Sequence, residues 1–282
     1  MSGVIRIWVN GDLYDSSAPA ISAIDHGLTV GDGIFETCKI VDGRAFAVTR
    51  HQQRMARSAH GLGLPEPDFS VIDAGIAAVL AAGDPIAWGR LRFTVTAGQG
   101  PLGSERHDSP LTYVVTAVPA EPPAGPGSLA VTPWTRNERS AVAGLKTTSY
   151  AENVVALAFA KERGASEAIF ANSRGDLCEG TASNVFVAIG GRLHTPPLSS
   201  GALGGITRAL TVQWCREADL EVVEEAMPLG VLRTCDEVFI TSSLRDVYPI
   251  ERIDDRRLPA PGPLTQQASA IFAARSAEDI DP

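Results

Sequence analysis

The segment Pro119–Gly127 is the feature that most constrains how this chain can fold. It holds four prolines and two glycines in nine residues, a density that neither a helix interior nor a central strand tolerates. This is the composition of a linker. Since 282 residues exceed the roughly 100–200 of one typical domain, we expect a small domain over 1–118, a linker over 119–127 and a larger domain over 128–282.

The small domain is predicted to be a mixed α/β unit. Alternating or β-branched apolar runs indicate strands, and these are Val4–Val9, Ile34–Ile40, Ala45–Val48, Ala87–Ala97 and Leu111–Val118. Asp42-Gly43 predicts a hairpin turn between the second and third of them. Helices are expected over Arg50–Leu62, with Thr49 as N-cap, and over Phe69–Ala82.

The larger domain is predicted to be richer in strands than in helices. Its expected strands are Ser128–Thr132, Glu167–Ala171, Val185–Ile189, Arg192–Thr195, Glu221–Glu225 and Glu237–Thr241. Its expected helices are Tyr150–Arg163, Thr207–Ala218 and Leu264–Arg275. Hairpins are frequent and the repeated β-α-β order of a doubly wound sheet is missing, so we predict an α/β fold of the α+β type.

Charge and composition exclude several classes of protein. The 24 basic and 33 acidic residues give a net charge of −9, and no basic cluster is present, so nucleic acid is not an expected partner. No run reaches the ~18 apolar residues of a membrane helix, and no signal peptide is recognised at the start. Four scattered cysteines and five scattered histidines predict neither disulfides nor a metal site, so we expect a metal-free cytoplasmic protein.

One glycine motif invites a nucleotide-binding interpretation that the context does not support. Gly98–Gly103 matches G-x-G-x-x-G after a predicted strand. A dinucleotide site needs a helix to begin there, but Pro101 lies inside the motif and the next segment leads into another strand. We therefore interpret the motif as a glycine-rich loop.

Only three of the basic residues are lysines, Lys39, Lys146 and Lys161, which leaves few candidates for amine chemistry. Lys146 has small neutral neighbours, which is unusual for a solvated lysine, and a partly buried lysine can form a Schiff base. Lys161 ends a predicted helix, as a surface lysine commonly does. Lys39 is a weaker candidate because it falls in the small domain.

Two further segments fit a bound cofactor. Glu179 lies in a polar stretch and could face a ring nitrogen, although a simple turn carboxylate is the alternative interpretation. Gly204-Gly205 precedes a predicted helix that begins near Thr207. Free amides at a helix start favour a phosphate, but each signal is weak alone.

Together with their neighbours, these residues form an ordered series of motifs. The series is Gly31–Glu36 (GDGIFE), His51–Arg54 (HQQR), Leu145–Tyr150 (LKTTSY), Glu179–Asn184 (EGTASN), Pro197–Arg208 (PLSSGALGGITR) and Thr241–Ser243 (TSS). It resembles the class-IV aminotransferases, pyridoxal-phosphate enzymes of fold type IV that include D-amino acid aminotransferases, branched-chain aminotransferases and aminodeoxychorismate lyases. The resemblance implies a small N-terminal α/β domain, a larger domain with a β-barrel-like sheet, pyridoxal 5′-phosphate between them, and a homodimer whose partner subunit completes the site.

The resemblance also implies roles for single residues. Lys146 would be the Schiff-base lysine and the acid/base that moves a proton between substrate Cα and cofactor. Glu179 would pair with the pyridine nitrogen and hold it protonated, which makes the ring an electron sink. Arg54 would bind the phosphate. The other implied cofactor residues are Tyr150 near O3′, Asn184, Ile206, Thr207, Ser242 and Ser243.

The substrate is less well defined by the sequence. An amino acid needs a carboxylate receptor, for which arginine is suited. Arg90 and Arg92 share one face of a predicted strand, and Arg90 is favoured. Phe35 stands where D-amino acid aminotransferases carry a carboxylate-binding tyrosine, and their Arg-x-His motif has no match in Gly98–His107, which implies a looser pocket.

The preferred hypothesis is a transaminase that uses a D-amino acid and a 2-oxo acid such as 2-oxoglutarate or pyruvate, with tolerance for (R)-amines left open. Thr37 matches a threonine of some aminodeoxychorismate lyases, which eliminate pyruvate and release 4-aminobenzoate, so that lyase is the alternative. A branched-chain L-amino acid aminotransferase ranks below it. A non-catalytic ligand-binding dimer is the hypothesis from another class, and it predicts a colourless protein.

Overall fold

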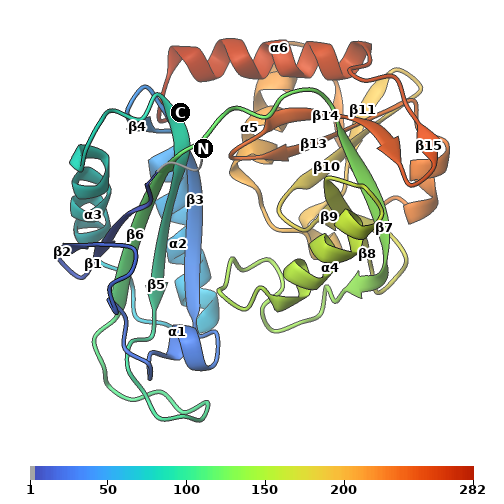
Figure 1. Ribbon diagram of the computed structural model, residues 1–282. Coiled ribbons are helices and arrows are strands. Elements are labelled where there is room, and N and C mark those ends of the chain that lie inside the picture. Colours follow the sequence, from blue (N-terminus) through green and yellow to red (C-terminus); the bar gives the residue numbers. More distant parts are fainter. Residues whose placement is uncertain (1–3) are drawn as a thin grey trace. The chain divides into compact units, whose positions relative to one another are not determined.

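The computed structural model describes residues 4–282, and within them the chain forms two compact units (Figure 1). Unit 1 contains the chain up to Pro122 together with Leu145–Ser149 and Ile280–Pro282, and unit 2 contains Pro123–Gly144 and Tyr150–Asp279. The division after Pro122 falls within the expected linker. The two short additions to unit 1 depart from the linear division, because these segments pack on the first unit although they are far away in sequence.

Unit 1 is built on an antiparallel sheet that is six-stranded within the described residues. In sheet order the strands are β2 (Asp12–Tyr14), β1 (Arg6–Val9), β6 (Thr112–Pro119), β5 (Trp88–Thr96), β3 (Gly33–Val41) and β4 (Arg44–Ala45). Asp42 and Gly43 have φ values of 48° and 74° and connect β3 to β4. This is the predicted hairpin turn, in a conformation that Asp-Gly adopts readily.

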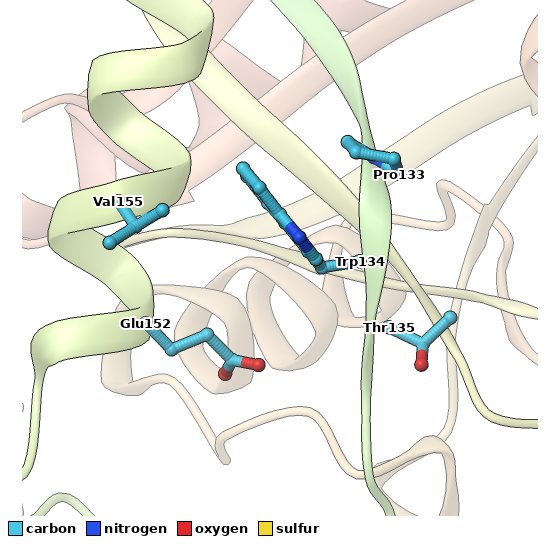
Figure 2. A pocket seen from close by; sticks show the side chains of 5 residues that line it. All are labelled: Pro133, Trp134, Thr135, Glu152 and Val155. Atoms are coloured by element: carbon cyan, nitrogen blue, oxygen red, sulfur yellow. The ribbon is translucent and has the colours of Figure 1, made fainter.

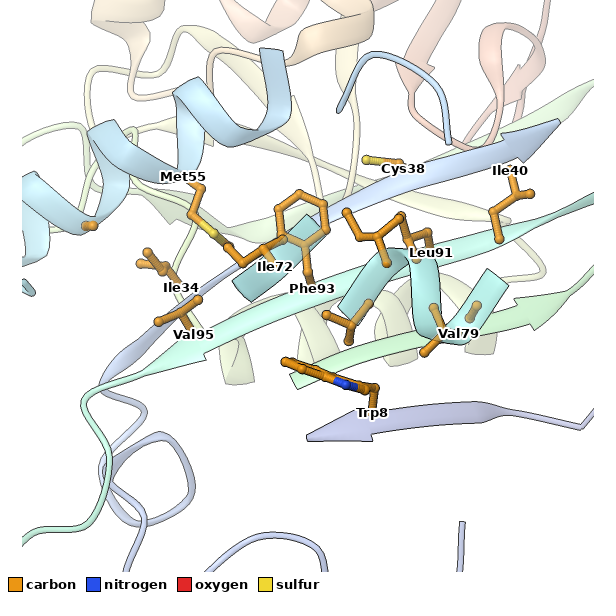
Figure 3. Packing of buried hydrophobic residues seen from close by; sticks show 14 of the residues in the cluster. Trp8, Ile34, Cys38, Ile40, Met55, Ile72, Val79, Leu91, Phe93 and Val95 are labelled. Atoms are coloured by element: carbon orange, nitrogen blue, oxygen red, sulfur yellow. The ribbon is translucent and has the colours of Figure 1, made fainter. Parts of the chain in front are cut away.

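Helices α2 (Val48–Leu62) and α3 (Phe69–Ala81) cover one face of this sheet, and the short α1 (His26–Thr29) precedes β3. The core between sheet and helices includes Ile34 and Ile40 of β3, Met55 of α2 and Phe93 of β5, all fully or almost fully buried (Figure 3). Burying each such side chain contributes about 1.5–3 kcal/mol. The core therefore fixes β3 and α2, which carry much of the candidate site.

The start of α2 differs from the prediction. Thr49 is not the N-cap: the helix begins at Val48 after Ala47, which has a left-handed φ of 57° and no side-chain cap. The expected strand Ala45–Val48 is correspondingly reduced to β4. Instead, the carboxylate of Asp281 accepts a hydrogen bond of 2.9 Å from the backbone N–H of Thr49. A cap provided from so far along the chain leaves no local sequence signal, which is why the prediction was wrong.

Unit 2 contains a closed β-barrel. Its strands are β7 (Gly127–Arg136), β8 (Glu167–Asn172), β9 (Leu177–Gly180), β10 (Asn184–Ile189), β13 (Glu237–Ser242) and β14 (Asp246–Ile253). The ring closes because β9 pairs with β10 at Glu179 and Asn184, while β14 pairs with β7. The apolar interior includes Leu129, Ile169, Val185 and Ile240.

The other elements of unit 2 extend or cover the barrel. They are β11 (Arg192–Thr195), β12 (Val222–Glu224), β15 (Arg256–Arg257), α4 (Ala151–Glu162), α5 (Ile206–Glu217), α6 (Pro263–Glu278) and the 3₁₀ helices η1 (Leu198–Ser200) and η2 (Leu229–Arg233). β7, α4 and β8 form a β-α-β unit with parallel strands, as do β11, α5 and β12 at the edge of the sheet. The other strand pairs of this sheet are antiparallel except β7 with β14. The predicted α+β class with a barrel-like second sheet is confirmed.

Two further expectations can be compared with the fold. Gly98–Gly103 lies in the connection between β5 and β6 and opens no helix, as the loop interpretation requires. Strand β14 has no counterpart among the predicted elements, because Pro249 lies inside it and proline argues against a strand in a sequence. No helix formed by residues 4–282 is long and apolar enough to cross a membrane.

Candidate active site

Strand β3 presents different chemistry on its two faces. Ile34, Glu36 and Cys38 face the helices, whereas Phe35 and Thr37 face the other way, because successive side chains of a strand alternate. Thr37 lies opposite Arg92 of β5 in the antiparallel register. The predicted substrate residues Phe35, Thr37 and Arg92 are therefore neighbours on one face of the sheet.

Lys146 is held along the edge of β3. Its carbonyl accepts a hydrogen bond of 3.1 Å from the Phe35 N–H, and Thr148 N–H donates to the Gly33 carbonyl at 2.8 Å. Its own N–H donates to the hydroxyl of Ser58 on α2 at 3.2 Å. The segment thus acts as a short extra strand, which fixes the backbone of the lysine while its side chain remains half-buried.

The Lys146 amine and one arginine meet at the same aromatic ring. Lys146 Nζ lies 4.2 Å from the centroid of Phe35, and the guanidinium carbon of Arg92 lies 3.6 Å from it. Arg90, which the sequence favoured, is exposed and lies opposite Lys39. Arg92 rather than Arg90 is thus beside the lysine, and the exposure of Arg90 fits a solvated residue.

The other two lysines have different surroundings. Lys39 is buried, and its Nζ lies 4.5 Å from the centroid of Phe46. Lys161 is exposed in the last turn of α4, as predicted. Because Leu145–Ser149 groups with unit 1, the expected difference in domain no longer separates Lys39 from Lys146. The two lysines differ instead in their aromatic neighbours, which are Phe46 for Lys39 and Phe35 for Lys146.

Arg54 of α2 belongs to a buried charged cluster with Glu36 and His51. Its Nε and Nη2 donate to the two carboxylate oxygens of Glu36 at 2.8 and 2.5 Å, and His51 Nδ1 lies 2.6 Å from Oε2. Burial alone would raise the pKa of Glu36, but the charge and hydrogen bonds of Arg54, followed by those of His51, lower it to about 2. Glu36 is thus ionised at neutral pH.

The remaining predicted cofactor residues lie in unit 2. Asn184 at the start of β10 is paired with Glu179 of β9 on one side and with Thr241 of β13 on the other. Barrel closure therefore brings together three strand ends that are far apart in sequence. Ser242 ends β13 directly after Thr241, and Ser243 is the first residue of the turn to β14.

Glu179 has two partners that orient its carboxylate. Oε2 accepts a 2.9 Å hydrogen bond from the Leu203 N–H, and Oε1 lies 3.5 Å from Nε of Arg136. Arg136 also contacts Glu152 and Asn153 of α4 and stacks on Phe170. Sequence reasoning missed Arg136, because its position at the end of β7 relative to β9 is set by the barrel.

The N-terminus of α5 is shaped by Asn184. The Nδ2 of Asn184 donates to the Leu203 carbonyl at 2.8 Å. A Cβ placed on Gly205, the N-cap residue, would lie 2.0 Å from the Oδ1 of Asn184. Glycine is thus needed here for space. Since Gly205 has no capping side chain, the amides of Ile206 and Thr207 at the helix start favour an anion.

A second ion pair links two segments of the candidate site. Glu167 of β8 accepts a hydrogen bond from the Thr181 N–H at 2.9 Å and also pairs with Arg245. Arg245 Nε in turn lies 3.2 Å from the hydroxyl of Ser242. Tyr150 joins the same region, since its hydroxyl donates to the Thr181 carbonyl at 3.2 Å.

Most of the chain matches a known protein family. The model for Amino-transferase class IV matches residues 33–253. The protein belongs to the class IV aminotransferases. Its class is thus the one that the motifs resembled, and because class IV enzymes depend on pyridoxal phosphate, it is a pyridoxal-phosphate-dependent aminotransferase.

Individual relatives agree on the family and differ in their substrates. The enzyme is 33% identical over 258 residues to a putative branched-chain-amino-acid aminotransferase of Methanocaldococcus jannaschii, with 89% of each chain covered. It is 33% identical over 276 residues to a D-alanine aminotransferase of Bacillus licheniformis, with 95% of this chain and 96% of the other covered. A hypothetical aminotransferase from Mycobacterium tuberculosis, solved in a PLP-bound form, matches with a TM-score of 0.82 and 27% identity over 96% of this chain and 98% of that one.

The residues of unit 2 fit the cofactor of this class. Among residues 4–282, the buried side-chain atoms without a hydrogen-bond partner are Arg136 Nε, Ser183 Oγ and Thr241 Oγ1. All three lie at or next to Glu179, Asn184 and Ser242. Buried polar atoms are normally satisfied, so this concentration of unused capacity indicates a polar ligand. Together with the carboxylate of Glu179 and the α5 amides, these groups suit a protonated ring and a phosphate.

A pocket elsewhere in unit 2 contains none of the predicted site residues. It is lined by Pro133, Trp134 and Thr135 of β7 and by Glu152 and Val155 of α4, with the Trp134 ring and Val155 facing it (Figure 2). Its walls are largely apolar and offer neither an amine nor an arginine. It is therefore a poor candidate for binding a phosphorylated cofactor.

Proposed function

We propose that this enzyme transfers the amino group of a D-amino acid to a 2-oxo acid such as 2-oxoglutarate or pyruvate. The observation that carries the proposal is the placement of Arg92 and Lys146 on the same ring of Phe35. A guanidinium near the reactive amine can bind the substrate carboxylate while the substrate nitrogen reacts. The D configuration is supported by the similarity to a D-alanine aminotransferase over nearly the whole chain.

Each predicted residue has a definite task in this proposal. Lys146 would hold the cofactor through Nζ and, as the free amine once the substrate nitrogen has displaced it, would move the proton at substrate Cα. Glu179 holds a proton on the ring nitrogen, and Arg136 keeps the Glu179 carboxylate in place. When bound, pyridoxal phosphate supplies an electron sink for the charge that develops at Cα. Arg54 and the start of α5 bind the phosphate.

Supporting contacts complete the assignment. Thr207, Ser242 and Ser243 offer hydroxyls to the phosphate, and Tyr150 orients the cofactor near O3′. Asn184 shapes the α5 start through its hydrogen bond to the Leu203 carbonyl. Phe35 and Thr37 border the substrate in this proposal, and the exposure of Arg90 favours Arg92 over Arg90 as the receptor of the substrate carboxylate.

A branched-chain L-amino acid is the second candidate for the donor. Arg106, in the loop where D-amino acid aminotransferases carry an Arg-x-His motif, donates to both oxygens of Asp32 at 2.6 Å and to the carbonyls of Leu62 and Gly63. An arginine engaged in this way is a poor carboxylate trap. The similarity to a putative branched-chain aminotransferase points in the same direction.

Donor and acceptor assays test the proposal. Purified holoenzyme is incubated with 2-oxoglutarate and D-alanine, L-leucine or L-valine, and the chirality of the glutamate product is determined. We expect turnover with D-alanine and formation of D-glutamate. Turnover confined to the L-amino acids would support the second candidate and refute the first. A parallel incubation with aminodeoxychorismate that yields 4-aminobenzoate, without amino transfer elsewhere, would assign a lyase, the alternative suggested by Thr37.

The lysine is tested independently of the substrate. The holoenzyme is expected to absorb visible light, to lose that band on borohydride reduction, and to yield a peptide carrying the reduced cofactor at Lys146. Lys146→Ala should abolish the visible band and the modified peptide. Lys39→Ala, which removes a lysine that is buried beside Phe46, should retain the band and the peptide. A modified peptide at Lys39 would overturn the assignment, and a colourless protein would indicate a non-catalytic dimer.

A homodimer in the cytoplasm is part of the proposal. On unit 2, Trp134, Val154 and Val155 are 41%, 65% and 52% exposed, and apolar side chains grouped on a surface indicate an interface. All four cysteines are free and buried, which fits a reducing compartment. Light scattering should give twice the chain mass, and Val155→Glu should reduce it. A monomeric wild-type enzyme would refute the dimer.

A further inference from the structure

The cluster of Glu36, His51 and Arg54 has a feature that folding alone does not require. Glu36 lies on the face of β3 that packs against α2, between Ile34 and Cys38, and is fully buried. An ionised carboxylate in such a place costs several kcal/mol in lost hydration, which its partners must offset. An apolar residue of similar size would serve the core as well, so the charge points to another role.

The partners of Glu36 hold a single orientation of Arg54. The two hydrogen bonds from Nε and Nη2 use both carboxylate oxygens, a planar arrangement that fixes the guanidinium. His51, one turn before Arg54 on α2, supports the same oxygen through Nδ1. Burial lowers the pKa of His51, the charge and hydrogen bond of Glu36 raise it, and the charges of Arg54 and Lys146 lower it, so that the net shift is downward. Because the ionised carboxylate of Glu36 can only accept, Nδ1 of His51 is the donor of their hydrogen bond.

We propose that Glu36 and His51 are positioning residues that prepare Arg54 to bind the cofactor phosphate. The proposal rests on the assignment of Arg54 to the phosphate under the proposed function. An arginine carries about 2 kcal/mol of rotamer entropy, and ordering it in advance removes much of that cost from cofactor binding. The cluster therefore raises affinity for the phosphate group and not for the pyridine ring.

A purely electrostatic role of Glu36 predicts the opposite result. A negative charge beside Arg54 reduces the attraction of that site for a dianion. If charge dominated, removing Glu36 would tighten phosphate binding. If orientation dominates, as we propose, removal weakens it. The sign of the effect therefore decides between the two.

The experiment compares pyridoxamine 5′-phosphate with pyridoxamine, which has the same ring and no phosphate. Neither reacts covalently with Lys146, so calorimetric titration of the apoenzyme isolates binding. For Glu36→Gln we expect the dissociation constant of pyridoxamine 5′-phosphate to rise about tenfold, since 1.4 kcal/mol corresponds to that factor. Pyridoxamine should change less than about twofold. His51→Asn leaves the Glu36–Arg54 pair in place. It should raise the dissociation constant of pyridoxamine 5′-phosphate about threefold and leave that of pyridoxamine unchanged.

Glu237→Gln is the matched control. Glu237 is another buried carboxylate, and it accepts hydrogen bonds from the Leu264 and Thr265 amides and the Thr265 hydroxyl at the start of α6 in unit 2. Its loss should lower the melting temperature without changing the ratio of the two dissociation constants. A change of that ratio in Glu237→Gln as large as in Glu36→Gln would show a general effect of destabilisation and overturn the proposal.

Arg54→Lys separates this proposal from the one on which it rests. If Arg54→Lys leaves the ratio unchanged, Arg54 does not bind the phosphate and the assignment under the proposed function fails. If Arg54→Lys changes the ratio of the two dissociation constants while Glu36→Gln and His51→Asn do not, the positioning role is refuted. It is also refuted if Glu36→Gln and His51→Asn tighten the binding of pyridoxamine 5′-phosphate. If Glu36→Gln fails to fold, His51→Asn carries the same test with the same signs.

Discussion

Asp281 caps helix α2 from 232 residues away in the chain. Its Oδ1 accepts from the Thr49 N–H at 2.9 Å and its Oδ2 accepts from the Thr49 hydroxyl at 2.5 Å. Two further hydrogen bonds hold the same segment: Ala47 N–H donates to the Ile280 carbonyl at 2.7 Å, and the side-chain Nε of Arg50 donates to the Pro282 carbonyl at 2.6 Å. Asp281→Ala removes the cap and keeps the acceptors of these two hydrogen bonds, which are backbone carbonyls.

The expected cost of Asp281→Ala follows from these contacts. Loss of an N-cap costs about 0.5–2 kcal/mol, and the lost attraction between a carboxylate and the helix N-terminus contributes about 0.3–1 kcal/mol at an exposed site. The two terms overlap, and Asp281 is exposed, so we expect a loss of about 1–2 kcal/mol. For a unit of this size that is a fall in Tm of about 3–6 °C.

Two variants serve as controls. Asp281→Asn keeps an acceptor for the Thr49 N–H but loses the charge, so it should retain about half of the stabilisation. Asp68→Ala removes the same kind of cap from α3, where Asp68 accepts from the N–H and hydroxyl of Ser70 at 2.9 and 2.6 Å. It should destabilise α3 while leaving α2 unchanged.

Urea unfolding gives the free energy, and hydrogen exchange locates the loss. In Asp281→Ala the amides of Thr49 and its neighbours in the first turn of α2 should exchange faster, with no change in α3. In Asp68→Ala the pattern should be reversed. If Asp281→Ala stays within about 0.3 kcal/mol of the wild type and exchange in α2 is unaltered, the distant cap is not formed in solution.

Three further predictions concern single groups. Because the pKa of Glu36 falls from 4.5 to about 2 on folding, its contribution of about 3 kcal/mol is fully present above pH 4.5 and is lost as the pH falls toward 2. Urea unfolding from pH 6 to 3 should show this loss, and its absence would contradict the charged cluster. Burial raises the pKa of Cys178 to about 12 and that of Cys215 to about 11, so neither should react with a thiol reagent at pH 8 unless urea is added. Arg106→Ala releases the loop that Arg106 ties to Asp32, and amides between β5 and β6 should then exchange faster at a stability cost below about 1 kcal/mol; unchanged exchange would show that other contacts hold the loop.

Local patterns were sufficient for many elements of the fold. The hairpin turn at Asp42-Gly43 and the helices over α3, α4 and α5 follow from turn chemistry and periodicity within a few residues. Failures occurred where the deciding partner is distant. Thr49 has the chemistry of an N-cap, yet Asp281 provides the cap, and β14 contains a proline that only its place in the barrel accommodates.

The candidate site divides in the same way. The motif series identified Lys146, Glu179 and Arg54 as residue types in an order typical of the family. It contained Glu36 without giving it a role, and it did not include Arg136. Strand alternation offered Arg90 and Arg92 as carboxylate receptors and favoured Arg90. The structure supports Arg92 in our proposal, since its guanidinium lies over the ring of Phe35 whereas Arg90 is exposed. Barrel closure brings Arg136 to Glu179. Neither fact is contained in a local window of sequence.

The sequence by itself predicted the family and the cofactor, and it supplied the proposal of Lys146 as the cofactor lysine, because these depend on residue types at fixed spacings. Only the tertiary structure decided what surrounds each group. Lys146 is placed by hydrogen bonds to the edge of β3, and Glu36 becomes a partner of Arg54 because a buried carboxylate must be paired. Hydrogen bonds and charge interactions act over a few ångströms in space. The partners of each group are therefore set by which residues the fold brings close, and these can be far apart in the chain.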